Sequence, residues 1–193
     1  MTRKKLKALT FADYIVNIIF SALGFIALSW LFNFSWGSFV YSIIFSFSLF
    51  AFMYSRGALA AKIDLREEKT PMSNAIKLAL PLTITLILLI TVYALILYNI
   101  IPVGDNIIKT AVSETGETSV FMVKNAVAIV IRILFLNITG FLSENLVNPI
   151  LLLISPAIVL LGSCTGYYFG RRKIYLLDIF IKIKQAIADK FNE

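Results

Sequence analysis

The sequence predicts an all-α integral membrane protein with four transmembrane helices, an outer-side amphipathic or re-entrant segment and a C-terminal amphipathic cytoplasmic helix. Of the 193 residues, 59% are hydrophobic and the mean hydropathy is +0.86, whereas soluble domains are about 45–50% apolar. Several apolar runs reach the roughly 20 residues that a helix needs to cross a hydrocarbon core. We expect a single polytopic membrane domain, 1–193, because no polar stretch is long enough to hold a separate soluble core.

The first two spans are expected at residues 11–32 and 36–55. The first run is too long for a signal-peptide core and lacks a small-residue cleavage pattern, so it is interpreted as an uncleaved span. Trp30 and Trp36 suit the far membrane interface, where amphipathic rings settle. Because only a short link joins the two spans, the second should return antiparallel, and Arg56 is expected to end it.

The third span is expected at residues 75–101, after a charged loop at 56–77. Thr70 and Pro71 suit the N-cap and first turn of the helix that leads into it. Pro81 should bend this helix or loosen its first turns, because proline lacks the N–H that a helix uses. A polar link then leads away from the third span.

The fourth span is expected at residues 149–170, with Asn148 as its N-cap, Pro149 in its first turn and Pro156 as a second kink. Residues 171–191 should form an amphipathic helix, with apolar side chains on one side and polar ones on the other. This pattern fits a helix on the cytoplasmic leaflet and equally well a helix docked in the groove of a partner protein.

The segment 125–142 is ambiguous, because it is long enough to cross a membrane but carries Arg132 near its middle. An Arg at the helix centre costs about 2.5–3.5 kcal/mol, which Ile, Leu, Phe and Val can offset at about 0.3–0.6 kcal/mol each. Charge placement decides between the alternatives. If the segment does not cross, 15 of the 18 Lys and Arg residues lie inside and only Lys109, Lys124 and Arg132 lie outside.

This asymmetry is what the positive-inside rule predicts. We therefore expect four spans in the plasma membrane, both termini in the cytoplasm, and an interfacial or re-entrant segment at 124–143. The basic residues Arg171, Arg172 and Lys173 would then anchor the last span at the inner leaflet.

A polar stripe runs along the ambiguous segment when it is drawn as a helix. Its members are Lys124, Asn125, Ala128, Arg132, Thr139 and Ser143. The stripe suits a connector lying in the outer interface. In a sharper hypothesis, Arg132, with Lys124 and Glu144 nearby, contacts an anionic solute or a lipid headgroup. Alternatively, Glu144 pairs with Arg132 and both charges are structural.

Candidate chemistry is sparse. The sequence has no His, and Cys164 is its single Cys, so neither an internal disulfide nor a His- or Cys-rich metal site is expected. No nucleophile–base pattern or phosphate-binding loop occurs, and we expect no catalytic residue, no metal and no cofactor. Asp13 and Asn17, one helical turn apart, are a candidate cation or proton site, although a solvated or capping Asp explains them as well.

Three glycines spaced by four, Gly162, Gly166 and Gly170, predict a helix-packing face in the last span. Lipid tails are as apolar as Leu, so close backbone approach drives helix association in a membrane. A series of small residues with the same spacing lies in the second span: Ser38, Ser42 and Ser46. We expect these two faces to pack together, within one chain or between two copies.

The sequence favours a non-enzymatic helical membrane subunit that packs against and supports a membrane complex, in connection with transport. One alternative is a self-sufficient oligomeric transporter or channel for a small or anionic solute. A weaker alternative is a lipid- or peptide-binding envelope or immunity protein. The expected partners are the lipid bilayer and either a membrane protein or further copies of this chain. Nucleic acid is not expected, because the basic residues lie beside apolar segments.

Overall fold

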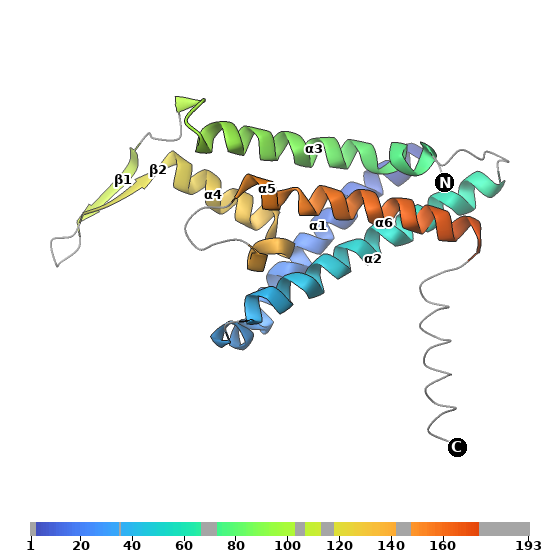
Figure 1. Cartoon of the computed structure of the whole chain (residues 1–193), viewed down its shortest axis with the longest axis horizontal. Helices are drawn as coiled ribbons and strands as arrows, with labels where there is room; N and C mark the ends of the chain where they lie inside the picture. Colours follow the sequence, from blue (N-terminus) through green and yellow to red (C-terminus); the bar gives the residue numbers. More distant parts are fainter. Residues whose placement is uncertain are drawn as a thin grey trace, which may run out of the picture. The chain divides into compact units, whose positions relative to one another are not determined.

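The computed structural model describes residues 3–34, 36–66, 73–102, 107–112, 118–141 and 148–173 (Figure 1). Nearly all of these residues are helical. The long helices are α1 (Arg3–Ala27), α2 (Gly37–Arg66), α3 (Ser73–Leu97) and α6 (Ile154–Arg171), with a short α5 (Pro149–Leu152) directly before α6. The segments long and apolar enough to cross a membrane are Lys5–Ala27, Gly37–Leu65, Asn74–Leu97 and Pro149–Arg171. A multi-pass helical membrane protein with four candidate spans is therefore confirmed.

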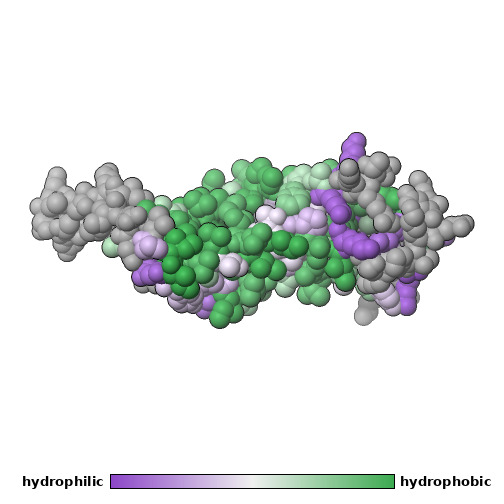
Figure 2. Space-filling view, turned by 90° about the horizontal axis from the view of Figure 1, so that it is seen from above, coloured by the Kyte–Doolittle hydropathy of each residue, from purple (hydrophilic) through white to green (hydrophobic). Residues whose placement is uncertain are grey.

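Large apolar side chains are exposed along the long helices. Leu23 in α1, Phe47 in α2, Leu88 in α3 and Leu161 in α6 are 56–61% exposed, and apolar residues make up most of the coloured surface in Figure 2. Soluble monomers rarely expose apolar surface on this scale. In a bilayer these side chains meet hydrocarbon, so their exposure fits the candidate spans.

The described helices form two compact units. The first unit comprises the described residues within Met1–Tyr14, Ser48–Thr83 and Ile158–Glu193, and the second those within Ile15–Phe47 and Ile84–Ala157. In the first unit, α6 packs on α2, and the core there is formed by small and apolar residues. Its buried members are Leu6, Ala60, Ala61, Ala75, Leu78 and Tyr167.

The helix of the second span does not end at Arg56, and the end of the span itself stays a prediction. α2 continues to Arg66, and α3 already begins at Ser73, so most of the predicted charged loop is helical. Within the helix, the charge of Arg56 is paired: Asp13 of α1 binds its guanidinium through two hydrogen bonds. This ion pair offsets the positive charge of Arg56, which in the sequence pattern indicates the end of a span. The predicted cap at Thr70 and Pro71 lies outside the described residues.

The helix of the first span ends earlier than the expected span. α1 stops at Ala27, and a 3₁₀ helix, η1 (Ser29–Asn33), leads into the corner before α2. Trp30 and Trp36 lie at this corner, and both are more than half exposed. Gly37 begins α2 where any Cβ would overlap the backbone of Leu31, so the tight turn requires glycine.

The polar link after α3 contains a β-hairpin that the sequence analysis missed. Strands β1 (Ile107–Val112) and β2 (Thr118–Met122) pair antiparallel, with Val112 opposite Thr118 and an irregularity between Ile107 and Lys109. β-Branched residues on both sides of Gly116 were the available signal. The two strands are short, and the long apolar runs on either side of them determine the hydropathy pattern. The hairpin is therefore not visible in that pattern.

The ambiguous segment is not one continuous helix. α4 (Val123–Leu134) has 12 residues, a length of about 18 Å, which falls short of a hydrocarbon core about 30 Å thick. It is followed by the 3₁₀ helix η3 (Leu136–Phe141). The break coincides with Asn137, whose side chain exchanges hydrogen bonds of 3.2 Å with Ser155. The Ser46 hydroxyl donates to the Asn137 carbonyl, also at 3.2 Å. Whether α4 lies in the interface or belongs to a re-entrant hairpin stays a prediction.

The predicted start of the last span is confirmed, and its interior is interrupted. The Asn148 side chain accepts a hydrogen bond of 3.0 Å from the Ile150 N–H, and Pro149 occupies the first turn. α5 ends at Leu152 and α6 begins at Ile154. Pro156 cannot donate a hydrogen bond back to Leu152, which accounts for the interruption. Pro81 lies inside α3 without ending it. The predicted amphipathic helix beyond Lys173 lies outside the described residues.

Candidate functional site

The three glycines of α6 lie against α2 in the first unit. A Cβ on Gly162 would come within 2.9 Å of the Met53 Cβ, and one on Gly170 within 2.7 Å of the Ala58 Cα. At Gly166, an added Cβ would overlap the backbone of Tyr54. The glycines therefore allow the two backbones to approach more closely than any side chain permits.

The structure does not bring these glycines against the serine series. Ser42 is fully buried and Ser38 half-buried in the second unit, and Ser46 bonds to Asn137. The residues that face the glycines come later in α2, where Gly57 in turn sits against the backbone of α6. Small residues at 57, 58, 60 and 61 are the sequence signal for the part of this face beyond the expected span end at residue 55.

Asp13 lies in a paired environment. Its two carboxylate oxygens accept hydrogen bonds from Arg56 Nε and, at 2.8 Å, from Nη2. The side chains are 12% and 25% exposed, respectively. A cation at the predicted Asp13 site would have to compete with this bidentate guanidinium.

Asn17, one helical turn further along α1, is fully buried, as is Ser21 on the following turn. Neither side chain has a hydrogen-bond partner among the described residues, although Tyr41 donates to the backbone oxygen of Ser21 at 2.7 Å. Buried polar atoms without partners are rare, because their desolvation is uncompensated. Asn17 and Ser21 thus mark a polar strip inside the second unit.

A buried carboxylate that the sequence analysis did not single out, Asp64, lies near the end of α2. It is 3% exposed, and its Oδ2 atom accepts hydrogen bonds of 2.7 Å from the Tyr167 hydroxyl and from the Asn74 amide. Asp64 therefore ties together α2, α3 and α6 within the first unit. In the sequence, Lys and Arg residues flank Asp64, so the pattern places it in a charged loop.

We expect Asp64→Ala to lower the free energy of unfolding by about 2 kcal/mol, because it removes a charged acceptor shared by two hydrogen bonds. Tyr167→Phe removes only one of these bonds and should lose about half as much. Reversible unfolding in mixed micelles measures both. Lys62→Ala, an exposed position on the same helix, serves as the control. Equal stabilities of Asp64→Ala and the control would contradict this role of Asp64.

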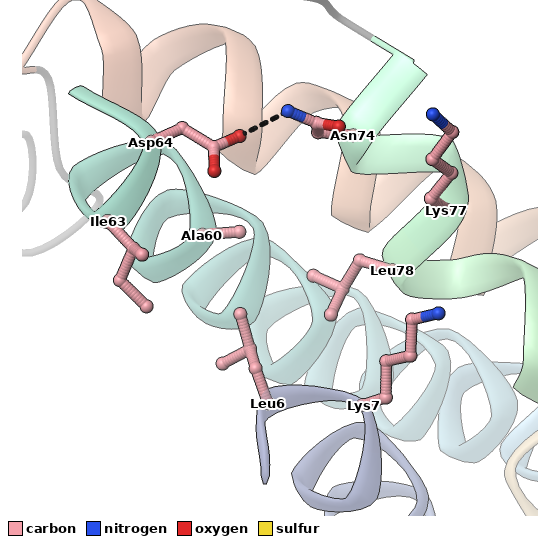
Figure 3. Close-up of a pocket in the computed structure, with 8 residues that line it drawn as sticks. All are labelled: Leu6, Lys7, Ala60, Ile63, Asp64, Asn74, Lys77 and Leu78. Atoms are coloured by element: carbon pink, nitrogen blue, oxygen red, sulfur yellow. Dashed lines mark hydrogen bonds between the residues drawn. The ribbon is translucent and has the colours of Figure 1, made fainter. Parts of the chain in front are cut away.

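A pocket of about 150 Å³ lies beside Asp64 in the first unit (Figure 3). Its apolar wall is formed by Leu6, Ala60, Ile63 and Leu78, and its polar wall by Lys7, Asp64, Asn74 and Lys77. Lys7 comes from α1 and Lys77 from α3, with their ammonium groups apart in this view, while Asp64 and Asn74 are joined by their hydrogen bond. The polar wall of the pocket thus has two lysines and a fixed carboxylate, and it lies beside the apolar wall.

The residues predicted to contact an anion are placed elsewhere. Lys124 and Arg132 lie on α4 in the second unit, half-buried and engaged in interactions. Arg132 is in the last turn of the helix, where a cation interacts favourably with the helix dipole. The exposed residues of α4 include Ile129 and Ile133. Glu144 lies outside the described residues, so its pairing with Arg132 stays a prediction.

The basic triplet at the end of α6 is exposed. The Arg172 guanidinium carbon lies 4.4 Å from the centre of the Tyr168 ring, and Lys173 adopts a left-handed backbone conformation just beyond the helix. Arg171 belongs to the last turn of α6. This arrangement agrees with a helix end at a polar boundary, and the side of the membrane stays a prediction.

The described residues contain no group of three or more His, Cys, Asp or Glu side chains that could hold a metal ion. Cys164 is half-buried and packs against the core of the first unit, as a small apolar residue does. Comparison of the chain with protein-family models, curated proteins and solved structures found no match.

Proposed function

We propose that this protein is a non-enzymatic helical subunit that packs against and supports a transport-related complex in the plasma membrane. One observation carries the proposal: several strongly polar side chains of the spans and of η3 bind each other. Asp13 binds Arg56, Asn137 binds Ser155, and Asp64 accepts two hydrogen bonds. Groups committed in this way hold helices together, whereas an active site needs groups that can engage a substrate.

The test compares assembly with autonomous transport. The full chain, tagged and expressed at native level, should co-purify with one membrane complex at a fixed stoichiometry, and its deletion should lower the amount of that complex. The purified protein alone should not carry solute flux in liposomes. A protein that purifies only by itself and carries flux would overturn the proposal.

A second function, an oligomeric transporter or channel, is supported by Asn17 and Ser21. Two buried, unpartnered polar side chains on successive turns of α1 are groups to which a permeating water or solute could form hydrogen bonds. If this function is the correct one, Asn17→Leu should block flux in liposomes and Asn17→Ala should not. Equal flux in both variants would contradict a path at Asn17.

We also propose that both termini are cytoplasmic, as the positive-inside rule requires. Single cysteines at Lys124 and Lys173, in a Cys164→Ser background, test this orientation with a membrane-impermeant thiol reagent. The Lys124→Cys protein should be labelled from outside intact cells, and the Lys173→Cys protein only after permeabilisation. The opposite pattern would reverse the topology.

A further inference from the structure

We propose that the pocket lined by Lys7, Lys77, Asp64 and Asn74 binds the phosphate group of a singly charged phosphodiester, and that a membrane lipid is its source. The proposal goes beyond a packing role, and it concerns only the first unit. It rests on the charges that line the pocket, on where the two lysines lie along their helices, and on the size and polarity of the walls.

The two lysines are available to bind an anion. Both are exposed residues that line the pocket, and neither side chain forms an ion pair or hydrogen bond with another described residue. An ammonium group binds a phosphate oxygen through charge-assisted hydrogen bonds, which are about twice as strong as neutral ones. Because both side chains are exposed and have flexible four-carbon stems, their ammonium groups can turn toward one bound phosphate.

The lysines lie where lipid phosphates lie. Lys7 is in the first turn of the candidate span Lys5–Ala27, and Lys77 is in the first turn of Asn74–Leu97. The ends of spans reach the headgroup layer, which adds about 10–15 Å to the hydrocarbon core. Beside Lys77 on α3, Ile76 and Leu80 are 46% and 44% exposed, so an acyl chain below the phosphate would meet apolar side chains.

Asp64 selects for a single negative charge. Two lysines and one aspartate give the wall a formal excess of one positive charge. The carboxylate is held in place by Asn74 and Tyr167, so it cannot turn away from a bound anion. A phosphodiester carries one negative charge, whereas a phosphate monoester or polyphosphate brings additional charge close to Asp64. A headgroup hydroxyl can donate to a carboxylate, which favours a glycerol headgroup.

The size of the pocket also suits a small group. A volume of about 150 Å³ is below the roughly 300–1,000 Å³ of pockets that enclose drug-sized molecules. The pocket therefore has room for a small group such as a phosphate, and the rest of a larger ligand would lie outside it. Its wall of Leu6, Ala60, Ile63 and Leu78 is apolar, and this agrees with a ligand whose remainder is lipid.

Native mass spectrometry of the full chain in a neutral detergent, with lipid added, tests the site. Phosphatidylglycerol should bind more tightly than phosphatidylcholine, and Lys7→Gln/Lys77→Gln should weaken phosphatidylglycerol binding about tenfold or more. The matched control, Lys5→Gln/Lys62→Gln, removes two exposed charges that do not line the pocket and should bind within about twofold of the unchanged protein. Lys7→Arg/Lys77→Arg should retain binding, which shows that the charge matters.

Inorganic phosphate distinguishes the source of the anion. If it does not compete with phosphatidylglycerol at millimolar concentration, the lipid is the ligand. If it competes, and direct binding of phosphate is lost in the pocket variant but kept in the matched control, the site stands with a soluble phosphate compound as its source. If the pocket variant and the control lose binding equally, or neither loses it while circular dichroism shows intact helices, the proposal is wrong.

Discussion

Gly166→Leu is expected to destabilise the protein by about 3 kcal/mol or more, the upper end of the range for overpacking. The reason is that an added Cβ would overlap the backbone of Tyr54. A clash with a flexible side chain can be relieved by rotation, but a clash with backbone requires α2 and α6 to separate. Their separation would expose the core that Tyr167 and Ala61 share. Reversible unfolding in mixed micelles measures the loss.

The matched control for this packing is an alanine substitution at another helical glycine. In Gly24→Ala, the new methyl group meets the ring of Phe45, a side chain that can move. In Gly166→Ala it meets backbone, so Gly166→Ala should be the more destabilising of the two. The opposite order would show that close backbone approach does not hold α6 on α2.

Arg56→Ala is expected to lower the free energy of unfolding by about 2–3 kcal/mol. It leaves the carboxylate of Asp13, whose side chain is only 12% exposed, without its bidentate partner. Breaking a fully buried pair costs about 3–5 kcal/mol, and the partial exposure of Arg56 reduces this value. Asp13→Ala should also destabilise, because it leaves the guanidinium without its acceptor.

A double-mutant cycle isolates the pair. Asp13→Ala/Arg56→Ala should lose less stability than the two single substitutions together, with a coupling free energy of about 1–3 kcal/mol. Lys62→Ala lies at an exposed position of the same helix. Its coupling free energy with Asp13→Ala should be close to zero. Strict additivity of Asp13→Ala and Arg56→Ala would show that the ion pair does not stabilise the fold.

Hydropathy alone predicts the existence of the four long helices, because lipid exposure requires a long uniformly apolar run. The cap at Asn148 and Pro149 was also predictable, since its chemistry is local. The end of α2 was not. Arg56 is paired with Asp13, 43 residues earlier, and no local pattern reveals such a partner. The break at Asn137 likewise depends on Ser155, on a different helix.

For the candidate site, the sequence reveals individual residues but not how they come together. Lys7 and Lys77 were visible as basic residues at span ends, but their convergence on one pocket needs the packing of α1, α2 and α3 within the first unit. Asp64 looked like a loop residue because α2 was expected to stop before it. The glycines of α6 predicted a packing face, and the identity of the facing surface depended on how far α2 extends.

The length of α2 has a consequence for the kind of membrane that suits this protein. Its 30 residues measure about 45 Å, against a hydrocarbon thickness of about 30 Å. Tilt alone would have to reach about 48° to accommodate the difference, beyond the 0–40° found for transmembrane helices. Part of α2 must therefore project from the hydrocarbon, and the polar end that holds Asp64 is suited to do so. Bilayer thickness then determines how much of this end lies among the headgroups. Through hydrophobic mismatch, it therefore also determines how deep in the headgroup layer the pocket lies.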